Sequence, residues 1–262
     1  MKPFAHPVRV FWQPGCTSCL KTKEFLEKNG VPFESINVMA DPAGLAALRA
    51  LGMRGVPVVA VGDEAVYSQS LVDVSKFLGL DVDFGKRLDE AELATRLSTV
   101  LVAALRYLDQ LPDELLQARY RDRDRTMRVL VHHIFRIAES FLEVAEAGPV
   151  LSYELEAVLR EPGDDIRGKR ELEAYGRSVL VRLDLLGARG LARLVHGIRV
   201  QTFYGEQSLH AVLELTTRHC TQHIRQLLAL MEEHGLAIDR PLGPAEFAGL
   251  PLPDKVWEPM PA

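Results

Sequence analysis

The sequence contains little cysteine and no long apolar run. Three cysteines in 262 residues cannot form the disulfide framework that stabilises small secreted domains. No segment approaches the ~18 apolar residues that a membrane-spanning helix needs. The opening residues, MKPFAHPVRVFW, lack the apolar region and the small-residue cleavage site of a secretory leader. We therefore expect a cytoplasmic protein with no membrane segment.

The sequence also lacks a basic excess. Its formal net charge is -5 at pH 7, which argues against broad nucleic-acid binding because such binding requires a basic face. Hydrophobic residues make up 47% and charged residues 26% of the chain, a composition typical of a protein with a hydrophobic core. The length favours two domains.

Strand and helix patterns alternate over residues 8–80. The segments VRVFW, VPFESINV, VPVVAVG and EAVYS predict four strands, and the last two form a hairpin that turns at Gly62-Asp63. Helical spacing follows the first strand at residues 17–29, and Asp41 with Pro42 predicts the start of a second helix. The segment SLVDVSKFLGL predicts a third. The order β-α-β-α-β-β-α predicts an α/β sandwich over residues 1–82.

The composition changes after a predicted linker at residues 83–90. Four long amphipathic patterns follow, at residues 89–117, 122–146, 168–187 and 206–234, with no convincing strand among them. They predict an all-α four-helix bundle over residues 91–235. Residues 236–262 hold six of the 15 prolines, so we expect a non-helical, extended tail that packs onto the body.

Cys16 and Cys19 form a C-x-x-C pair between a predicted strand and a predicted helix. A zinc site would need two further ligands, and no second C-x-x-C exists. A structural bridge would be unusual in a reducing compartment. A redox pair needs its first cysteine at a helix N-terminus, where the helix dipole and free amide groups stabilise the thiolate. Because Cys16 stands at such a position, we expect a redox pair in which Cys19 resolves the mixed disulfide.

The dipeptide Val56-Pro57 opens a predicted strand, a setting in which proline is otherwise disfavoured. In an oxidoreductase of this layout, a cis proline faces the cysteine pair, and the backbone groups before it pair with the substrate's chain. We therefore predict a cis Val56-Pro57 bond and assign both residues to substrate binding.

These features together resemble glutaredoxin and the glutaredoxin-like hydrogen donors of the thioredoxin superfamily. The resemblance covers residues 8–80 and rests on the first strand, the Cys16-to-Cys19 pair, its helix, and Val56-Pro57 before a hairpin. It implies a thioredoxin-like fold, with Cys16 as the nucleophile, Cys19 as the resolving thiol and Pro57 as the cis proline.

One segment departs from that family pattern. Members that use glutathione usually carry Gly-Gly and an acidic pair after the hairpin, whereas this chain reads YSQSLVD from Tyr67. Ser70 and Asp73 are still expected to cap the last helix of the domain. The departure puts glutathione in doubt and leaves the identity of the partner thiol open.

Three histidines of the predicted bundle can meet at one place. His219 and His223 are four residues apart on the fourth predicted helix, which corresponds to about 40° of rotation and about 6 Å of rise, so both project from one face. On the second predicted helix, His133 flanks the apolar stripe, and His132 is a close alternative. Three imidazoles and a water form the open arrangement typical of catalytic Zn²⁺. The alternative is that these histidines are surface or packing residues.

The segment YGEQSLHAVLELTTRHCTQHIRQL resembles the last helix of the DinB family of four-helix bundles. Members carry one histidine on the second helix and H-x-x-x-H on the fourth, commonly followed by glutamine, a pattern that His133, His219, His223 and Gln226 fit. The same bundle serves in bacterial thiol-dependent transferases and isomerases. The resemblance covers roughly residues 90–235 and implies a divalent metal, with Zn²⁺ expected first and Ni²⁺ or Mn²⁺ as alternatives.

The combined prediction is a two-domain, thiol-dependent enzyme. A glutaredoxin-like thiol–disulfide oxidoreductase domain is joined to a metal-binding bundle that acts on or with a low-molecular-weight thiol. The expected partners are that thiol or a protein disulfide, and a disulfide reductase. The rival prediction makes the bundle a binding or dimerisation module without chemistry of its own, which would form a homodimer.

Overall fold

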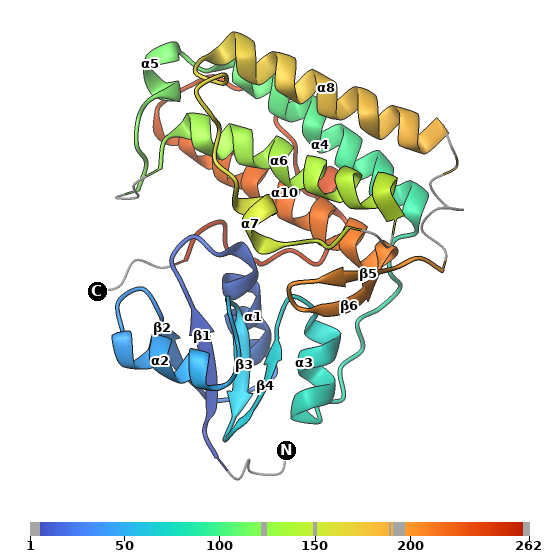
Figure 1. Ribbon diagram of the computed structural model, residues 1–262. Coiled ribbons are helices and arrows are strands. Elements are labelled where there is room, and N and C mark those ends of the chain that lie inside the picture. Colours follow the sequence, from blue (N-terminus) through green and yellow to red (C-terminus); the bar gives the residue numbers. More distant parts are fainter. Residues whose placement is uncertain (1–5, 122–124, 149–150, 189, 191–196, 259–262) are drawn as a thin grey trace. The chain divides into compact units, whose positions relative to one another are not determined.

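The computed structural model describes residues 6–121, 125–148, 151–188, 190 and 197–258, and its elements are labelled in Figure 1. The chain forms two compact units. The first comprises Met1–Arg87 together with Leu252–Ala262, and the second comprises Leu88–Pro251. The division between them falls within the segment 83–90 that the sequence marks as a linker.

The first unit is a four-stranded sheet with three helices. The strands β1 (Val8–Trp12), β2 (Phe33–Asn37), β3 (Val58–Val61) and β4 (Glu64–Tyr67) lie in the order β2-β1-β3-β4. β1 pairs with β2 in parallel, and β3 is antiparallel to both β1 and β4. The helices are α1 (Thr17–Lys28), α2 (Pro42–Ala50) and α3 (Leu71–Leu78). The predicted order β-α-β-α-β-β-α is therefore confirmed.

The central strands of this sheet are buried on both faces. Their side chains alternate with a period of two, so each strand contributes residues to both faces of the sheet. One hydrophobic cluster joins Val8 and Val10 of β1 to residues of α1 and α3. The other joins Phe11 to the start of α1 and to Leu48 of α2. The sheet thus holds the first turn of α1 at a fixed place beside the end of β1.

The second unit is built on four long helices. They are α4 (Glu90–Gln110), α6 (Met127–Ala147), α8 (Lys169–Ala188) and α10 (Leu209–Glu233), joined by the short helices α5 (Asp113–Leu116) and α7 (Leu155–Leu159). α10 packs on α6 and α4, and α8 packs on the same two helices (Figure 1). The four predicted helices are confirmed, as α4, α6, α8 and α10.

The ends of these helices follow from local sequence. Asp89 and Glu92 form a capping box at the start of α4, and the hydroxyl groups of Thr126 and Ser208 cap α6 and α10. The first helix was predicted to reach residue 117, but α4 ends at Gln110. Pro112 disfavours a helical conformation at the preceding Leu111, whose ψ is 128°.

The prediction that the second unit contains no strand was wrong. The strands β5 (Arg199–Thr202) and β6 (Gly205–Ser208) form an antiparallel hairpin just before α10. Gly205 adopts a φ of +108°, and the Thr202 hydroxyl donates to the Gly205 carbonyl across the turn (2.6 Å). The hairpin takes residues 206–208 that the pattern had assigned to the last helix.

The proline-rich tail is divided between the two units. Before Pro251 it lies along α4, where the Tyr107 hydroxyl accepts from the Leu242 amide (2.8 Å). Beyond Leu252 it contacts α1, and the Glu24 carboxylate accepts from the amides of Asp254 and Lys255 (2.6 and 3.0 Å). The tail was predicted to contain no helix, but α11 (Pro244–Phe247) forms one turn, because proline is tolerated at the first helical position.

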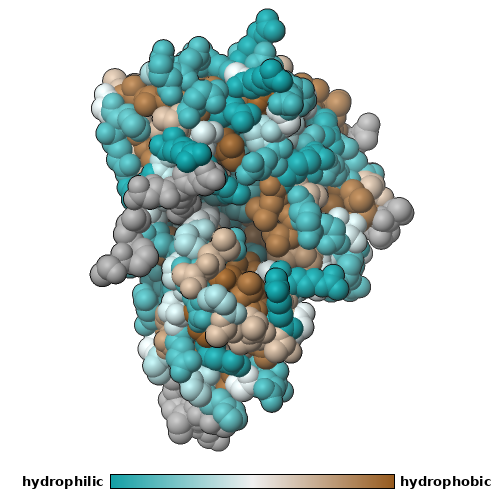
Figure 2. Space-filling view, turned by 60° about the vertical axis from the view of Figure 1, so that its left-hand side comes forward, coloured by the Kyte–Doolittle hydropathy of each residue, from teal (hydrophilic) through white to brown (hydrophobic). Residues whose placement is uncertain are grey.

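The surface in Figure 2 carries hydrophobic residues in separate patches among hydrophilic ones. In the part of the chain that the structure describes, no helix is both long enough and apolar enough to cross a lipid bilayer.

A glycine on α8 sets how closely this helix approaches the core of the bundle. A Cβ atom at Gly176 would lie 2.6 Å from Cζ of Phe135 and 2.9 Å from Cδ2 of Leu105, so a larger residue must displace buried side chains. We predict that Gly176→Val lowers the free energy of unfolding of this unit by about 1–3 kcal/mol, measured by urea titration of helical circular dichroism. Gly187→Val on the same helix, where a Cβ meets nothing within 4 Å, is the matched control and should change stability by less than ~0.5 kcal/mol. Equal effects would contradict the packing explanation.

Candidate functional site

Cys16 occupies the N-cap of α1, between the end of β1 and the first helical turn. Its Sγ accepts a hydrogen bond from the Cys19 backbone amide (3.1 Å). The amides of a first helical turn have no partners within the helix, and the helix dipole is positive at this end. Both effects favour a negatively charged sulfur at position 16. The structure thus places Cys16 where the sequence predicted it.

The two cysteines form a disulfide and differ in exposure. Their Cα atoms are 5.2 Å apart. Cys19 is fully buried, whereas Cys16 is partly exposed. An incoming thiolate or disulfide can therefore reach Cys16 more readily than Cys19. This asymmetry matches the predicted roles of nucleophile and resolving thiol.

The Val56-Pro57 peptide bond is cis, which confirms the sequence prediction. Val56 belongs to the same hydrophobic cluster as Cys19, and Cys16 packs against this cluster. The cis proline and the disulfide thus lie at one site, at the end of the sheet where β1 finishes and β3 begins. On the far side of the hairpin, Ser70 caps α3 by accepting from the Asp73 amide (3.3 Å), as expected without the Gly-Gly sequence.

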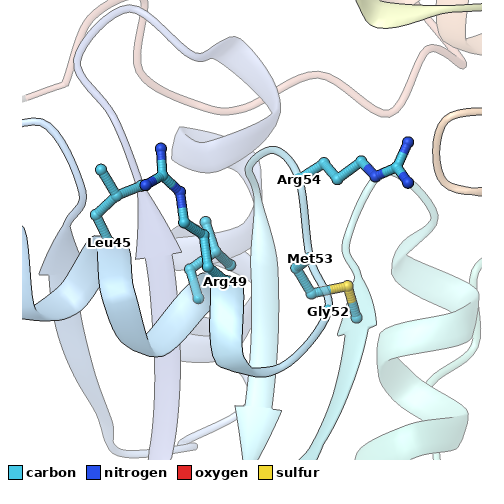
Figure 3. A pocket seen from close by; sticks show the side chains of 6 residues that line it. Leu45, Arg49, Gly52, Met53 and Arg54 are labelled. Carbon is cyan, nitrogen blue, oxygen red and sulfur yellow. The ribbon is translucent and has the colours of Figure 1, made fainter.

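A pocket of about 470 Å³ adjoins this site at the C-terminal end of α2. Leu45, Leu48 and Met53 line it and also belong to, or pack against, the cluster that contains Cys19. In Figure 3, Arg49 and Arg54 lie on opposite sides of the view, and the side chain of Arg54 extends away from Arg49. No ion pair or hydrogen bond joins either guanidinium to a described residue. Sequence analysis did not single out these arginines, although Arg54 stands only two residues before Val56.

His133, His219 and His223 come together between α6 and α10. One ring nitrogen of each lies within 4.8 Å of the others, and the ring centroids are 4.8 to 5.4 Å apart. His133 and His223 are buried, and His219 is partly exposed. The two helices supply the three imidazoles in the one-plus-two arrangement that the sequence predicted.

His132 does not join this cluster. Its ring stacks on Tyr175 of α8, with centroids 5.0 Å apart and planes 17° apart. Adjacent residues on a helix point about 100° apart, so only one of the pair can face α10. Cys220, next to His219, is fully buried, its Sγ lies 3.3 Å from the Ile134 carbonyl, and burial raises the pKa of its thiol. Cys220 is therefore a buried small residue of the bundle core.

Burial shifts the histidines toward their neutral form. Burial, followed by the neighbouring His223, holds the pKa of both His133 and His219 well below the ordinary value. Burial and the charge of Arg136 lower the pKa of His132 to about 4. Neutral imidazoles carry the lone pair that a metal ion requires.

Two members of the cluster have hydrogen-bond partners outside it. The Nδ1–H of His223 donates to Oε1 of Gln226 (2.7 Å), the glutamine that the sequence singled out. The Val158 carbonyl in α7 is in hydrogen-bonding contact with His133. Such partners orient metal-binding histidines and fix their tautomers. Glu139, which is also on α6, accepts from Tyr175 (2.6 Å) and Arg182 (3.0 Å).

The cluster fits a divalent metal. Nitrogens on a tetrahedral Zn²⁺ with bonds of about 2.0–2.1 Å lie roughly 3.4 Å apart, and the observed limit of 4.8 Å can close through small rotations of the imidazoles. Three nitrogen ligands, two with outer partners, would leave one position of a tetrahedral ion open for water or substrate. Among the described residues, this is the group of histidines, cysteines and carboxylates whose geometry suits a metal ion.

Comparison with known proteins identifies the first unit. The glutaredoxin family model matches residues 8–66. The glutaredoxin-like protein NrdH of Escherichia coli K12 is 41% identical over 56 residues, which are 21% of this chain and 69% of that protein. NrdH of Salmonella typhimurium is 38% identical over 56 residues, with the same coverage. A glutaredoxin-like 8.6 kDa protein of Clostridium pasteurianum is 26% identical over 72 residues, 27% of this chain and 96% of that protein.

Among solved structures, that of the thioredoxin-like protein BC3987 is 28% identical, covers 31% of this chain and 100% of its own, and aligns with a TM-score of 0.28. The matched segment 8–66 contains the N-cap Cys16, the buried Cys19 and the cis Val56-Pro57 bond. The chain therefore belongs to the glutaredoxin family, and its first unit is a glutaredoxin-like thiol–disulfide redox domain.

Proposed function

We propose that this protein is a thiol–disulfide oxidoreductase whose helical unit holds a divalent metal and acts on or with a low-molecular-weight thiol. The observation that carries the proposal is the presence on one chain of an N-cap cysteine pair and a cluster of three histidines, two of them buried. Because both sites lie on one chain, a product released at one site is present at a high effective concentration near the other.

The redox unit reduces its substrate in two exchange steps. The Cys16 thiolate attacks a sulfur of the substrate disulfide, forms a mixed disulfide and releases the first substrate thiolate. The Cys19 thiolate then attacks Sγ of Cys16, forms the Cys16–Cys19 disulfide and releases the second thiolate. Two electrons pass to the substrate, and a disulfide reductase or a thiol returns the pair to the dithiol. The backbone beside Pro57 would align the substrate's chain during both steps.

In the helical unit, His133, His219 and His223 would hold the metal, with Zn²⁺ expected first and Ni²⁺ or Mn²⁺ as alternatives. A bound divalent ion supplies Lewis acidity, which favours the deprotonated form of a thiol at neutral pH. Burial favours the neutral form of His133 and His219, and Gln226 and Val158 orient two of the three imidazoles. The DinB resemblance supports the same arrangement.

The substrate of the redox unit is proposed to carry a carboxylate. Arg49 and Arg54 place two positive charges at the pocket beside the disulfide, and neither is neutralised by a described residue. Arginine binds carboxylates through paired N–H donors. A thiol with a carboxylate, in its disulfide form, suits this pocket.

A second candidate function is dimerisation through the bundle. Val181 and Leu185 lie one turn apart on α8 and are 57% and 53% exposed. Such a pair favours contact with another protein surface. If the histidine cluster takes up no metal, this interpretation replaces the enzymatic one for the helical unit.

The roles of the cysteines predict different trapped products. Cys19→Ser should accumulate a mixed disulfide through Cys16, because the resolving thiol is missing. Cys16→Ser should accumulate none, since the two remaining cysteines, Cys19 and Cys220, are both buried. Mass spectrometry after reaction with a disulfide substrate measures both. A mixed disulfide on Cys19 in the Cys16→Ser protein would contradict the assignment.

Metal binding should depend on the cluster and on pH. His219→Ala should abolish stoichiometric Zn²⁺ binding and leave disulfide exchange at Cys16 within about twofold, because the two units have separate cores. Since the pKa values of His133 and His219 are lowered, protons compete only below the ordinary histidine range, and binding should persist at pH ~6 and fail on further acidification. Metal analysis of untagged protein and calorimetry measure this. His210→Ala, a histidine of α10 that pairs instead with Glu90 (3.0 Å), is the control and should keep its metal.

Charged disulfides test the arginine pocket. We expect kcat/KM for the dianion dithiodipropionate to exceed that for the dication cystamine. Combining Arg49→Gln with Arg54→Gln should reduce the value for dithiodipropionate by about tenfold, since two attractive charges are lost. The same variant should leave neutral hydroxyethyl disulfide unchanged, and Lys76→Gln on α3 should change none of the three. An equal loss for all three disulfides would show that the arginines serve the fold and not substrate charge.

A further inference from the structure

Arg136 on α6 is a fully buried cation that the proposed chemistry does not use. It is 0% exposed and lies one turn beyond His133. Its guanidinium donates to both carboxylate oxygens of Glu143 (2.8 and 2.5 Å) and also to Glu139. Burial opposes its charge, but the hydrogen bonds and charge of Glu143 raise its pKa. A buried arginine is therefore kept fully charged at this place.

A fourth donor of Arg136 reaches the backbone of α7. Its Nε donates to the Ala157 carbonyl (2.7 Å). α7 has five residues, so the carbonyls of its last turn have no partners inside the helix. The next carbonyl in the chain, that of Val158, is the one in contact with the imidazole of His133. The side chains of His133 and Arg136, three residues apart on α6, thus contact two consecutive carbonyls of α7.

A second contact ties the same turn to the same carboxylates. Arg160 follows α7 directly, and its guanidinium lies 3.6 Å from Glu139 and 3.8 Å from Glu143. Both ends of the Ala157–Val158 backbone are therefore held against α6 by one ionic cluster. The position of the Val158 carbonyl relative to His133 depends on that cluster.

We propose that Arg136 is a positioning residue for His133: by fixing the α7 backbone through the Ala157 carbonyl, it holds the Val158 carbonyl on the imidazole and so sets that ring's tautomer and orientation. This inference rests on the proposed function in treating His133 as a metal ligand. The ring nitrogen that faces α7 carries the proton, and the other nitrogen presents its lone pair to His219 and His223. Outer hydrogen-bond partners of this kind commonly change metal affinity by 10–100-fold.

The test uses the full-length protein and the variant Arg136→Lys. Lysine keeps the positive charge beside Glu139 and Glu143 but cannot reproduce the planar fork that spans Glu143 and Ala157. In the metal-free protein, nitrogen-15 NMR of the imidazoles should show one His133 tautomer in the wild type and a mixture in Arg136→Lys. Competition with a chelator should show Zn²⁺ affinity reduced by about tenfold or more.

The control is Arg182→Gln. Arg182 belongs to the same ionic cluster through Glu139 and Glu146 (3.0 and 2.9 Å), but its partners among the described residues include no carbonyl of α7. It should lower stability and leave the His133 tautomer and Zn²⁺ affinity unchanged. Glu143→Gln, which weakens the hold on Arg136, should shift both readouts in the same direction as Arg136→Lys, by less.

The outcomes separate this inference from the proposed function. A wild-type protein that binds no Zn²⁺ contradicts the proposed metal site, while its His133 tautomer still reports on positioning. A folded Arg136→Lys protein with the wild-type tautomer and affinity overturns the positioning role. Equal changes in Arg136→Lys and Arg182→Gln would also overturn it, because they would reflect general loosening of the bundle.

Discussion

The close packing of α6 against α10 is the constraint on which the helical unit depends. Both helices are buried along most of their length, and their contact brings one histidine of α6 to two of α10. Burying three imidazoles costs free energy unless each finds a partner, and Gln226, the Val158 carbonyl and mutual contact supply partners. The same burial favours the neutral form of His133 and His219, so the packing that stabilises the bundle also suits these rings to the proposed metal. The ionic cluster around Arg136 lies on the next turn of α6 and holds α7 in place.

The redox unit follows from a different constraint, the position of a sulfur at the end of a buried strand. β1 is covered on both faces, so the chain leaving it must enter α1 at a fixed point. Cys16 meets the free amides there, and Cys19 turns inward toward Val56. At the neighbouring pocket, Arg49 lies on α2 and Arg54 lies on the segment that leads to Pro57. The sheet holds β3, which follows Pro57, in register with β1. The fold, the asymmetry of the cysteines and the positions of the two arginines thus have a common origin.

Much of this arrangement could be predicted from the sequence, because local signals coincide with tertiary demands. The spacing of His219 and His223, the cysteine pair after β1 and the proline before β3 each specify geometry on their own. The β5–β6 hairpin was missed, because residues 206–208 were read as the start of a long helix. The contacts of Arg136 with α7 were also missed, since a carbonyl partner leaves no mark on residue identity. The choice between His132 and His133 needed the structure, because adjacent residues differ only in the helix face they occupy.

The central claim is that three histidines from two helices bind one metal ion. X-ray absorption at the zinc edge, on untagged protein loaded with Zn²⁺ and with the cysteine pair reduced, tests it most directly. The account predicts a first shell with three imidazole nitrogens at about 2.0–2.1 Å. A first shell dominated by sulfur at about 2.3 Å, which only the cysteines could supply, would contradict it.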